Sequence, residues 1–164
     1  MSETLEPALP KELDEQAERV MRRLCDEELS VATAESCTGG LLASLLTDIE
    51  GCGRGFERGF VTYSGEAKKE LLGLPADKVE ENEAVNADVA RDMAEGALNR
   101  SKADIALSVT GFADKGDEPG LVHFACARAG RKTAHREEHF GPVGRGATRI
   151  ACMGVAVEMM TEML

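Results

Sequence analysis

Apolar residues recur at helical spacing in several stretches of this chain. After Pro10, which suits a first helical turn, one face collects Leu13, Ala17, Val20, Met21 and Leu24, and this pattern predicts an amphipathic helix. Further helices are predicted over residues 39–46, 64–72, 86–101 and 145–163, the second and third with Ser64 and Asn86 as N-caps.

Short β-rich runs separate these helices. Strands are predicted over residues 30–34, 59–63 and 104–110, and residues 121–128 and 133–140 form a predicted hairpin around Ala129-Gly130-Arg131. Helices interleaved with strands indicate a layered α/β domain, and the late hairpin predicts a mixed sheet. Residues 1–9 are predicted to be a flexible acidic leader, so that the domain covers residues 10–164.

Composition and charge exclude several classes of protein. At 164 residues, with 43% hydrophobic and 30% charged residues, the chain is typical of one soluble globular domain. A net charge of −11 argues against binding to nucleic acid or to anionic membranes. No apolar run approaches the roughly 20 residues that span a bilayer, and the acidic start is not a signal peptide. Five widely spaced cysteines without a C-x-x-C motif indicate reduced thiols in a cytoplasmic protein.

Residues 33–40 read TAESCTGG and lie where an apolar strand gives way to an apolar helix. Ser36 at the strand end would face the N-terminus of that helix, where free backbone N–H groups favour an anion or a developing oxyanion. Gly39 and Gly40 would let a substrate approach the backbone closely. Such residues also serve merely to cap a helix and form a turn, so both interpretations stay open.

A nucleophilic serine needs a base, and the three histidines all lie late in the chain. Lys68, one turn into the 64–72 helix, is the other candidate, because a desolvated lysine can lose its proton near neutral pH. Tyr63, the only tyrosine, ends the preceding strand and is either a relay or orienting group or a half-buried core aromatic. Residues 108–111 (SVTG) end a third strand with a polar residue and a glycine, which suggests a crevice at one sheet edge.

Three other motifs are weaker. His135 and His139 match the zinc-peptidase pattern H-x-x-E-H, but the segment is too short for the helix that pattern needs. On a strand the two residues would lie about 13 Å apart, so no metal site is expected. Cys37, beside Ser36, is a second possible nucleophile, interpreted here as a small packed residue. The acidic stretch 114–118 lacks the spacing of a calcium loop and is interpreted as a solvated turn.

Four stretches together resemble the C-terminal domain of the competence/damage-inducible protein CinA family. They are ESCTGG at 35–40, ERGFVTYSGEAK at 57–68, DMAEGAL at 92–98 and SVTG at 108–111. The resemblance covers about residues 10–163 and is densest from Val31 to Gly111. It implies a three-layer α/β/α domain, a homodimer or larger homo-oligomer, and no cofactor. It also implies hydrolysis of the carboxamide of nicotinamide mononucleotide (NMN), or of a related small amide, to the acid and ammonia.

The same resemblance assigns roles to individual residues. It implies Ser36 as nucleophile and Lys68 as base, supported by Tyr63 and Thr110. The implied substrate-binding residues are Glu35, Thr38, Gly39, Gly40, Gly111 and Arg145. Residues 111–120 (GFADKGDEPG) are shorter and more acidic than the family pattern. The alternative is therefore a divergent family member that binds a nucleotide or a partner protein without turnover.

Overall fold

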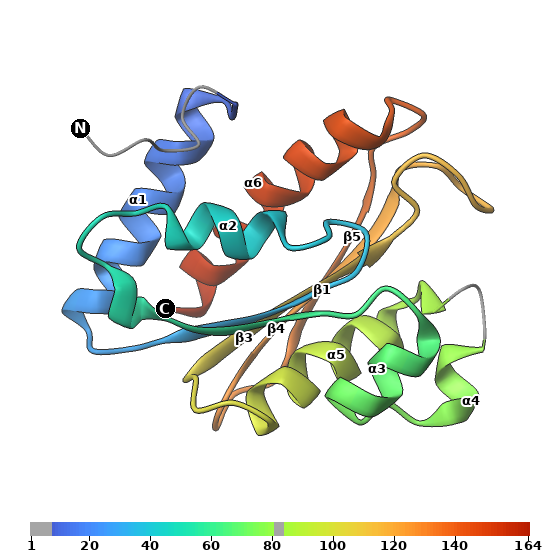
Figure 1. Ribbon diagram of the computed structural model, residues 1–164, viewed down its shortest axis with the longest axis horizontal. Coiled ribbons are helices and arrows are strands. Elements are labelled where there is room, and N and C mark those ends of the chain that lie inside the picture. Colours follow the sequence, from blue (N-terminus) through green and yellow to red (C-terminus); the bar gives the residue numbers. More distant parts are fainter. Residues whose placement is uncertain (1–7, 81–83) are drawn as a thin grey trace.

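The computed structural model describes residues 8–80 and 84–164, and this part of the chain contains a five-stranded sheet in the order β2-β1-β3-β4-β5 (Figure 1). The strands are β1 Val31–Glu35, β2 Phe56–Val61, β3 Ile105–Gly111, β4 Leu121–Arg128 and β5 Ala134–His139. β2 and β3 flank β1 in parallel, whereas β4 and β5 add to β3 as an antiparallel hairpin. The prediction of a mixed sheet is confirmed.

Helices cover both faces of this sheet, which confirms the three-layer α/β/α arrangement (Figure 1). α1, α2 and α6 lie on one face, and α3, α4 and α5 on the other. Their bounds are α1 Lys11–Asp26, α2 Leu41–Thr47, α3 Gly65–Leu72, α4 Ala76–Val79, α5 Ala87–Asn99 and α6 Arg145–Met163, with a 3-10 turn at Gly53–Gly55. Neither α4 nor the 3-10 turn was predicted from the sequence.

The two predicted N-caps are confirmed. The Ser64 hydroxyl accepts a hydrogen bond from the Ala67 N–H at 3.1 Å, and Asn86 Oδ1 accepts one from the Val89 N–H at 2.9 Å. Helix α2 begins two residues later than predicted, because Gly39 (φ 59°) and Gly40 (φ 100°) form the turn before it with left-handed backbone. Strand β2 begins at Phe56 rather than at residue 59.

The sheet is held between two apolar layers of different composition. The layer under α1, α2 and α6 contains large side chains such as Leu42, Phe124 and Met153. The layer under α5 is built with small residues from the sheet, including Ala32 and Ala106, which let the helix pack close to the strands. The central strands are therefore buried on both faces, as the apolar runs around 31–34 and 105–109 indicate.

Three other predictions concern the cysteines, membrane spans and the acidic leader. All five cysteines are buried free thiols. Among the described residues, no helix combines the length and apolar character that crossing a membrane requires. Most of the predicted leader, residues 1–7, lies outside the described residues.

Candidate active site

Ser36 and Lys68 meet at the carboxyl end of β1. Ser36 continues the strand, since its N–H donates to the Val109 carbonyl at 3.0 Å. Lys68, in the first turn of α3, places its Nζ 3.0 Å from Ser36 Oγ. The same amine donates to the carbonyls of Thr62 at 3.0 Å and Tyr63 at 3.3 Å. Both side chains are buried, Ser36 being 7% and Lys68 1% exposed.

Burial changes the protonation chemistry of this amine. It lowers the pKa of Lys68 to about 8, because the ammonium loses its hydration, and the nearby Cys37 opposes the shift only in part. About a tenth of such amines are neutral at pH 7, far more than for a lysine in water. Lys68 can therefore act as a proton acceptor for Ser36 near neutral pH.

Glu35 holds the turn that carries Ser36. Its fully buried carboxylate accepts hydrogen bonds from the Thr38 hydroxyl at 2.7 Å, the Leu42 N–H at 2.8 Å and the Ala43 N–H at 3.0 Å. The expectation that the first N–H groups of α2 are free for a ligand is therefore wrong for Leu42 and Ala43. The side chains of Glu35 and Thr38, both expected to bind substrate, make these hydrogen bonds to each other and to the helix. Their contacts are those of a helix cap.

Replacing Glu35 by alanine is expected to lower the free energy of unfolding by about 3 kcal/mol, because two buried donors and one partly buried donor lose a charged acceptor. Chemical denaturation measures the loss. Glu35→Gln should lose less, since its amide oxygen can still accept. Glu66→Ala, which removes an exposed carboxylate paired with Lys69, should change stability by less than about 0.5 kcal/mol. Equal effects of Glu35→Ala and Glu66→Ala would contradict the capping role.

A small pocket of about 170 Å³ adjoins the Ser36–Lys68 pair. It is lined by Cys37, Tyr63, Gly111, Phe112, Ala113, Asp114, Lys115, Gly116 and Arg145. Cys37 follows Ser36 directly, and the Tyr63 carbonyl accepts a hydrogen bond from Lys68, so the pocket and the pair share their connecting backbone. Three loops and the start of α6 thus form one site at the predicted edge of the sheet.

Tyr63 lies at the rim of this pocket. Its side chain is 67% exposed, so the interpretation as a half-buried core aromatic is wrong. The Tyr63 hydroxyl and the Asp114 carboxylate together raise the pKa of Arg145. Arg145 Nη2 also donates to Asp114 Oδ1 at 2.6 Å. The structure therefore places the phenol beside Arg145, and in the described chain no hydrogen bond joins it to Ser36 or Lys68.

Thr110 and Gly111 end β3 next to these groups. The buried Thr110 hydroxyl donates to the Ala84 carbonyl at 3.0 Å, and within the described residues it has no hydrogen bond to Ser36 or Lys68. A Cβ added at Gly111 would lie 2.6 Å from the Leu121 carbonyl oxygen. The close pairing of β3 with β4 thus requires glycine at this position, whether or not a ligand also contacts it.

Arg149 contacts the backbone of Cys37, the residue after Ser36, and was not predicted as a site residue from the sequence. Its Nε donates to the Cys37 carbonyl at 2.8 Å, and its guanidinium lies 3.6 Å from the position of a Cβ added at Gly39. Arg145 and Arg149 are four residues apart on α6 and so share one helix face. The four-residue spacing of these two arginines is the sequence feature from which Arg149 could have been predicted. Cys37 itself is 4% exposed, and a hydrogen bond with the Cys152 thiol lowers its pKa.

The H-x-x-E-H segment forms strand β5, not a helical turn. The His135 ring contacts His123, with 3.0 Å between Nε2 and Nδ1, whereas His139 contacts Glu118 and Glu137. In residues 8–80 and 84–164, no group of three or more His, Cys, Asp or Glu side chains could hold a metal ion.

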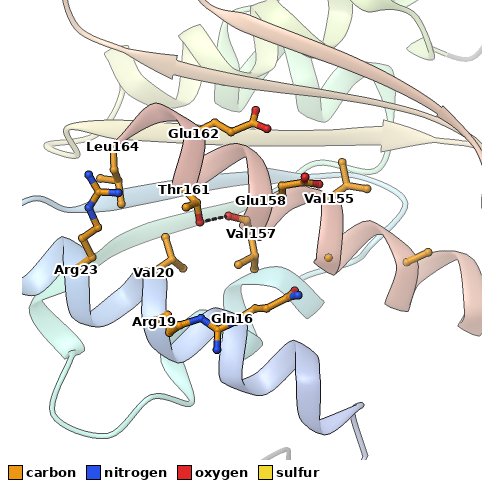
Figure 2. A pocket seen from close by; sticks show the side chains of 12 residues that line it. Gln16, Arg19, Val20, Arg23, Val155, Val157, Glu158, Thr161, Glu162 and Leu164 are labelled. Atoms are coloured by element: carbon orange, nitrogen blue, oxygen red, sulfur yellow. Dashed lines mark hydrogen bonds between the residues drawn. The ribbon is translucent and has the colours of Figure 1, made fainter.

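A larger groove of about 790 Å³ lies between α1 and α6 (Figure 2). Figure 2 shows an apolar floor that includes Val20 and Val157, with Arg19 and Glu158 at its edges. The Thr161 hydroxyl in its wall donates to the Val157 carbonyl within the same helix. None of its lining residues forms a nucleophile and base pair, so the candidate active site is the smaller pocket beside Ser36.

Comparisons with known proteins agree on one family. The model of the CinA C-terminal domain matches residues 13–164. The nicotinamide-nucleotide amidohydrolase PncC of Escherichia coli (strain K12) is 43% identical over 156 residues, covering 92% of this chain and 94% of that protein. A CinA-like protein of Chlorobium limicola is 50% identical over 106 residues, but the match spans only 25% of its length. The solved structure of competence/damage inducible protein CihA from Agrobacterium tumefaciens has a TM-score of 0.91 at 38% identity, covering 99% of this chain and 98% of that one.

Proposed function

The chain belongs to the CinA C-terminal domain family, and on this premise we propose that it hydrolyses the carboxamide of NMN to nicotinate mononucleotide and ammonia. The E. coli relative, which carries the name of this activity, aligns over nearly the whole of both chains. The observation that carries the proposal is the 3.0 Å contact between Lys68 Nζ and Ser36 Oγ in a buried site. Such a pair is a nucleophile with its base in hydrogen-bond reach.

In the proposed acylation step, the neutral Lys68 amine accepts the hydroxyl proton while Ser36 Oγ attacks the carboxamide carbon. The Lys68 ammonium then gives its proton to the amide nitrogen, the C–N bond breaks and ammonia leaves. The product is an ester between Ser36 and the nicotinoyl group. In the second step Lys68 deprotonates a water molecule that attacks this ester. Ser36 then leaves with the proton from Lys68, and both groups return to their starting states.

The turn at residues 37–40 is the proposed site of oxyanion stabilisation. The N–H groups of Leu42 and Ala43 are occupied by Glu35. Those of Thr38 and Gly40 make no hydrogen bond in the described part of the chain, and they are left to receive the developing charge. Glu35 supports this role indirectly, because its bonds to α2 hold the turn rigid.

Positive charge around the pocket fits a mononucleotide substrate. Arg145 and Lys115 line the pocket, and Arg149 binds the Cys37 carbonyl beside the nucleophile. Guanidinium groups bind phosphate through paired N–H donors, so we propose that the α6 arginines receive the 5′-phosphate of NMN. The family resemblance further supports a homo-oligomer, and the five buried free thiols support a cytoplasmic location.

The direct test is ammonia release from NMN by the purified protein, with nicotinate mononucleotide identified chromatographically. We expect multiple turnovers per protein molecule without added metal or nucleotide. One observation favours the alternative, a family member that binds nucleotides without turnover. Arg145 already donates a hydrogen bond to Asp114, so its guanidinium is less available to a substrate. Tight binding of NMN without release of ammonia would support that alternative and contradict the proposed hydrolysis.

A further inference from the structure

The pocket beside the Ser36–Lys68 pair is lined by a carboxylate of the protein itself. Asp114, in the loop between β3 and β4, contacts Arg145 at the start of α6 with 2.6 Å between Oδ1 and Nη2. The side chains are partly exposed, 30% for Asp114 and 42% for Arg145, so solvent and small ligands can reach both. Both residues line the same pocket. The ion pair therefore neutralises Arg145, one of the cationic groups of the site, with a carboxylate of the same chain.

A carboxylate and a phosphate compete for the same guanidinium donors. A substrate phosphate that approaches Arg145 must displace Asp114 or accept its repulsion. The other acids of this loop are placed differently. Glu118 contacts His139, and Asp117 is exposed and has no ion pair within the described chain. Asp114 is thus the acid of this loop that engages a cation of the pocket.

We infer that Asp114 is a specificity-determining residue that acts through Arg145 and sets how strongly the site binds phosphorylated substrates. This inference rests on the proposed function. The pair weakens binding of every ligand whose phosphate needs Arg145, by the energy of the displaced contact. A neutral group at the same place, such as the free 5′-hydroxyl of nicotinamide riboside, leaves the pair intact. The charge state of the substrate at this position therefore decides whether Asp114 matters.

The test is Asp114→Asn, which keeps the shape of the side chain and removes its charge. The KM for NMN is expected to fall about fivefold, with kcat changed by less than about twofold, because a partly exposed ion pair no longer competes. The kcat/KM for nicotinamide riboside should stay within about twofold. Asp117→Asn is the matched control, since it removes the same charge from the same loop. Its effect on the KM for NMN should be below about 1.5-fold.

A double-mutant cycle separates action through Arg145 from a general change of charge. In an Arg145→Gln background, Asp114→Asn should no longer lower the KM for NMN, because the cation for which it competes is gone. Three results would overturn the inference: an unchanged or higher KM in Asp114→Asn, equal effects of Asp114→Asn and Asp117→Asn, or an undiminished effect in Arg145→Gln.

Calorimetric titration with NMN keeps this inference distinct from the proposed hydrolysis. If the unmodified protein releases no ammonia but Asp114→Asn binds NMN about fivefold more tightly, hydrolysis fails and the role of Asp114 stands. If NMN is turned over but Asp114→Asn has no effect, the role of Asp114 fails and hydrolysis stands. Absence of NMN binding in both proteins would overturn both.

Discussion

Ser36→Ala is expected to reduce ammonia release from NMN by about a thousandfold or more, because the substitution removes the atom that we propose attacks the carboxamide. The fold should remain intact. Among the described residues, the Ser36 hydroxyl has a hydrogen bond only with Lys68, and its backbone N–H still bonds to Val109. Steady-state release of ammonia, with thermal unfolding of the same sample, measures both expectations.

The control for this variant is Cys37→Ala, one position further along the same turn. Cys37 is buried beside Cys152 and within the described chain has no base in hydrogen-bond contact, so its loss should reduce turnover far less than the loss of Ser36. The reverse order, with Ser36→Ala close to wild type and Cys37→Ala inactive, would move the nucleophile to the thiol.

Lys68→Arg is expected to be nearly inactive, with a loss of about a thousandfold, although it preserves positive charge and approximate length. A general base must be neutral before it accepts the serine proton, and a guanidinium does not lose its proton in this pH range. Lys69→Arg is the matched control. Lys69 is the next residue on α3, partly exposed and paired with Glu66, so its replacement should leave turnover unchanged.

The pH profile of the unmodified protein tests the same assignment. Because the pKa of Lys68 is lowered to about 8, the neutral amine increases as pH rises toward this value. Activity should therefore rise about tenfold per pH unit below pH 8 and level off above it. Activity that falls as pH rises from 6 to 8, or Lys68→Arg with nearly wild-type turnover, would show that Lys68 only supplies charge, for example to a substrate phosphate.

Local sequence signals predicted most of the architecture. The caps Ser64 and Asn86 and the bounds of α6 follow from short-range chemistry that acts within one or two helical turns, and the structure agrees with them. The start of α2 was misplaced because Gly39 and Gly40 lie on the boundary between an apolar run and a turn. The hydrogen bond of Glu35 with the N-terminus of α2 is likewise not revealed by the hydrophobic periodicity.

For the candidate site, too, some residues could be predicted from the sequence and some contacts could not. Ser36 and Lys68 could be proposed from residue type, position at element ends and family resemblance. The roles of Glu35, Tyr63 and Thr110 could not, because each depends on which neighbour its polar group meets. Glu35 meets the start of α2, Thr110 meets the Ala84 carbonyl, and Tyr63 lies beside Arg145.

The sequence by itself determined the α/β layering, the mixed sheet, the serine and glycines at strand ends and the lysine in a first helical turn, because these follow from hydrophobic period and local backbone preference. Only the tertiary structure decided that Ser36 and Lys68, 32 residues apart, lie 3.0 Å from each other. The parallel pairing of β1 with β2, and the packing that buries Lys68 and Leu72 of α3, bring them together. Only burial, a property of the whole fold, lowers the pKa of Lys68. The pairing of Asp114 with Arg145 likewise exists only because the β3–β4 loop and α6 converge there.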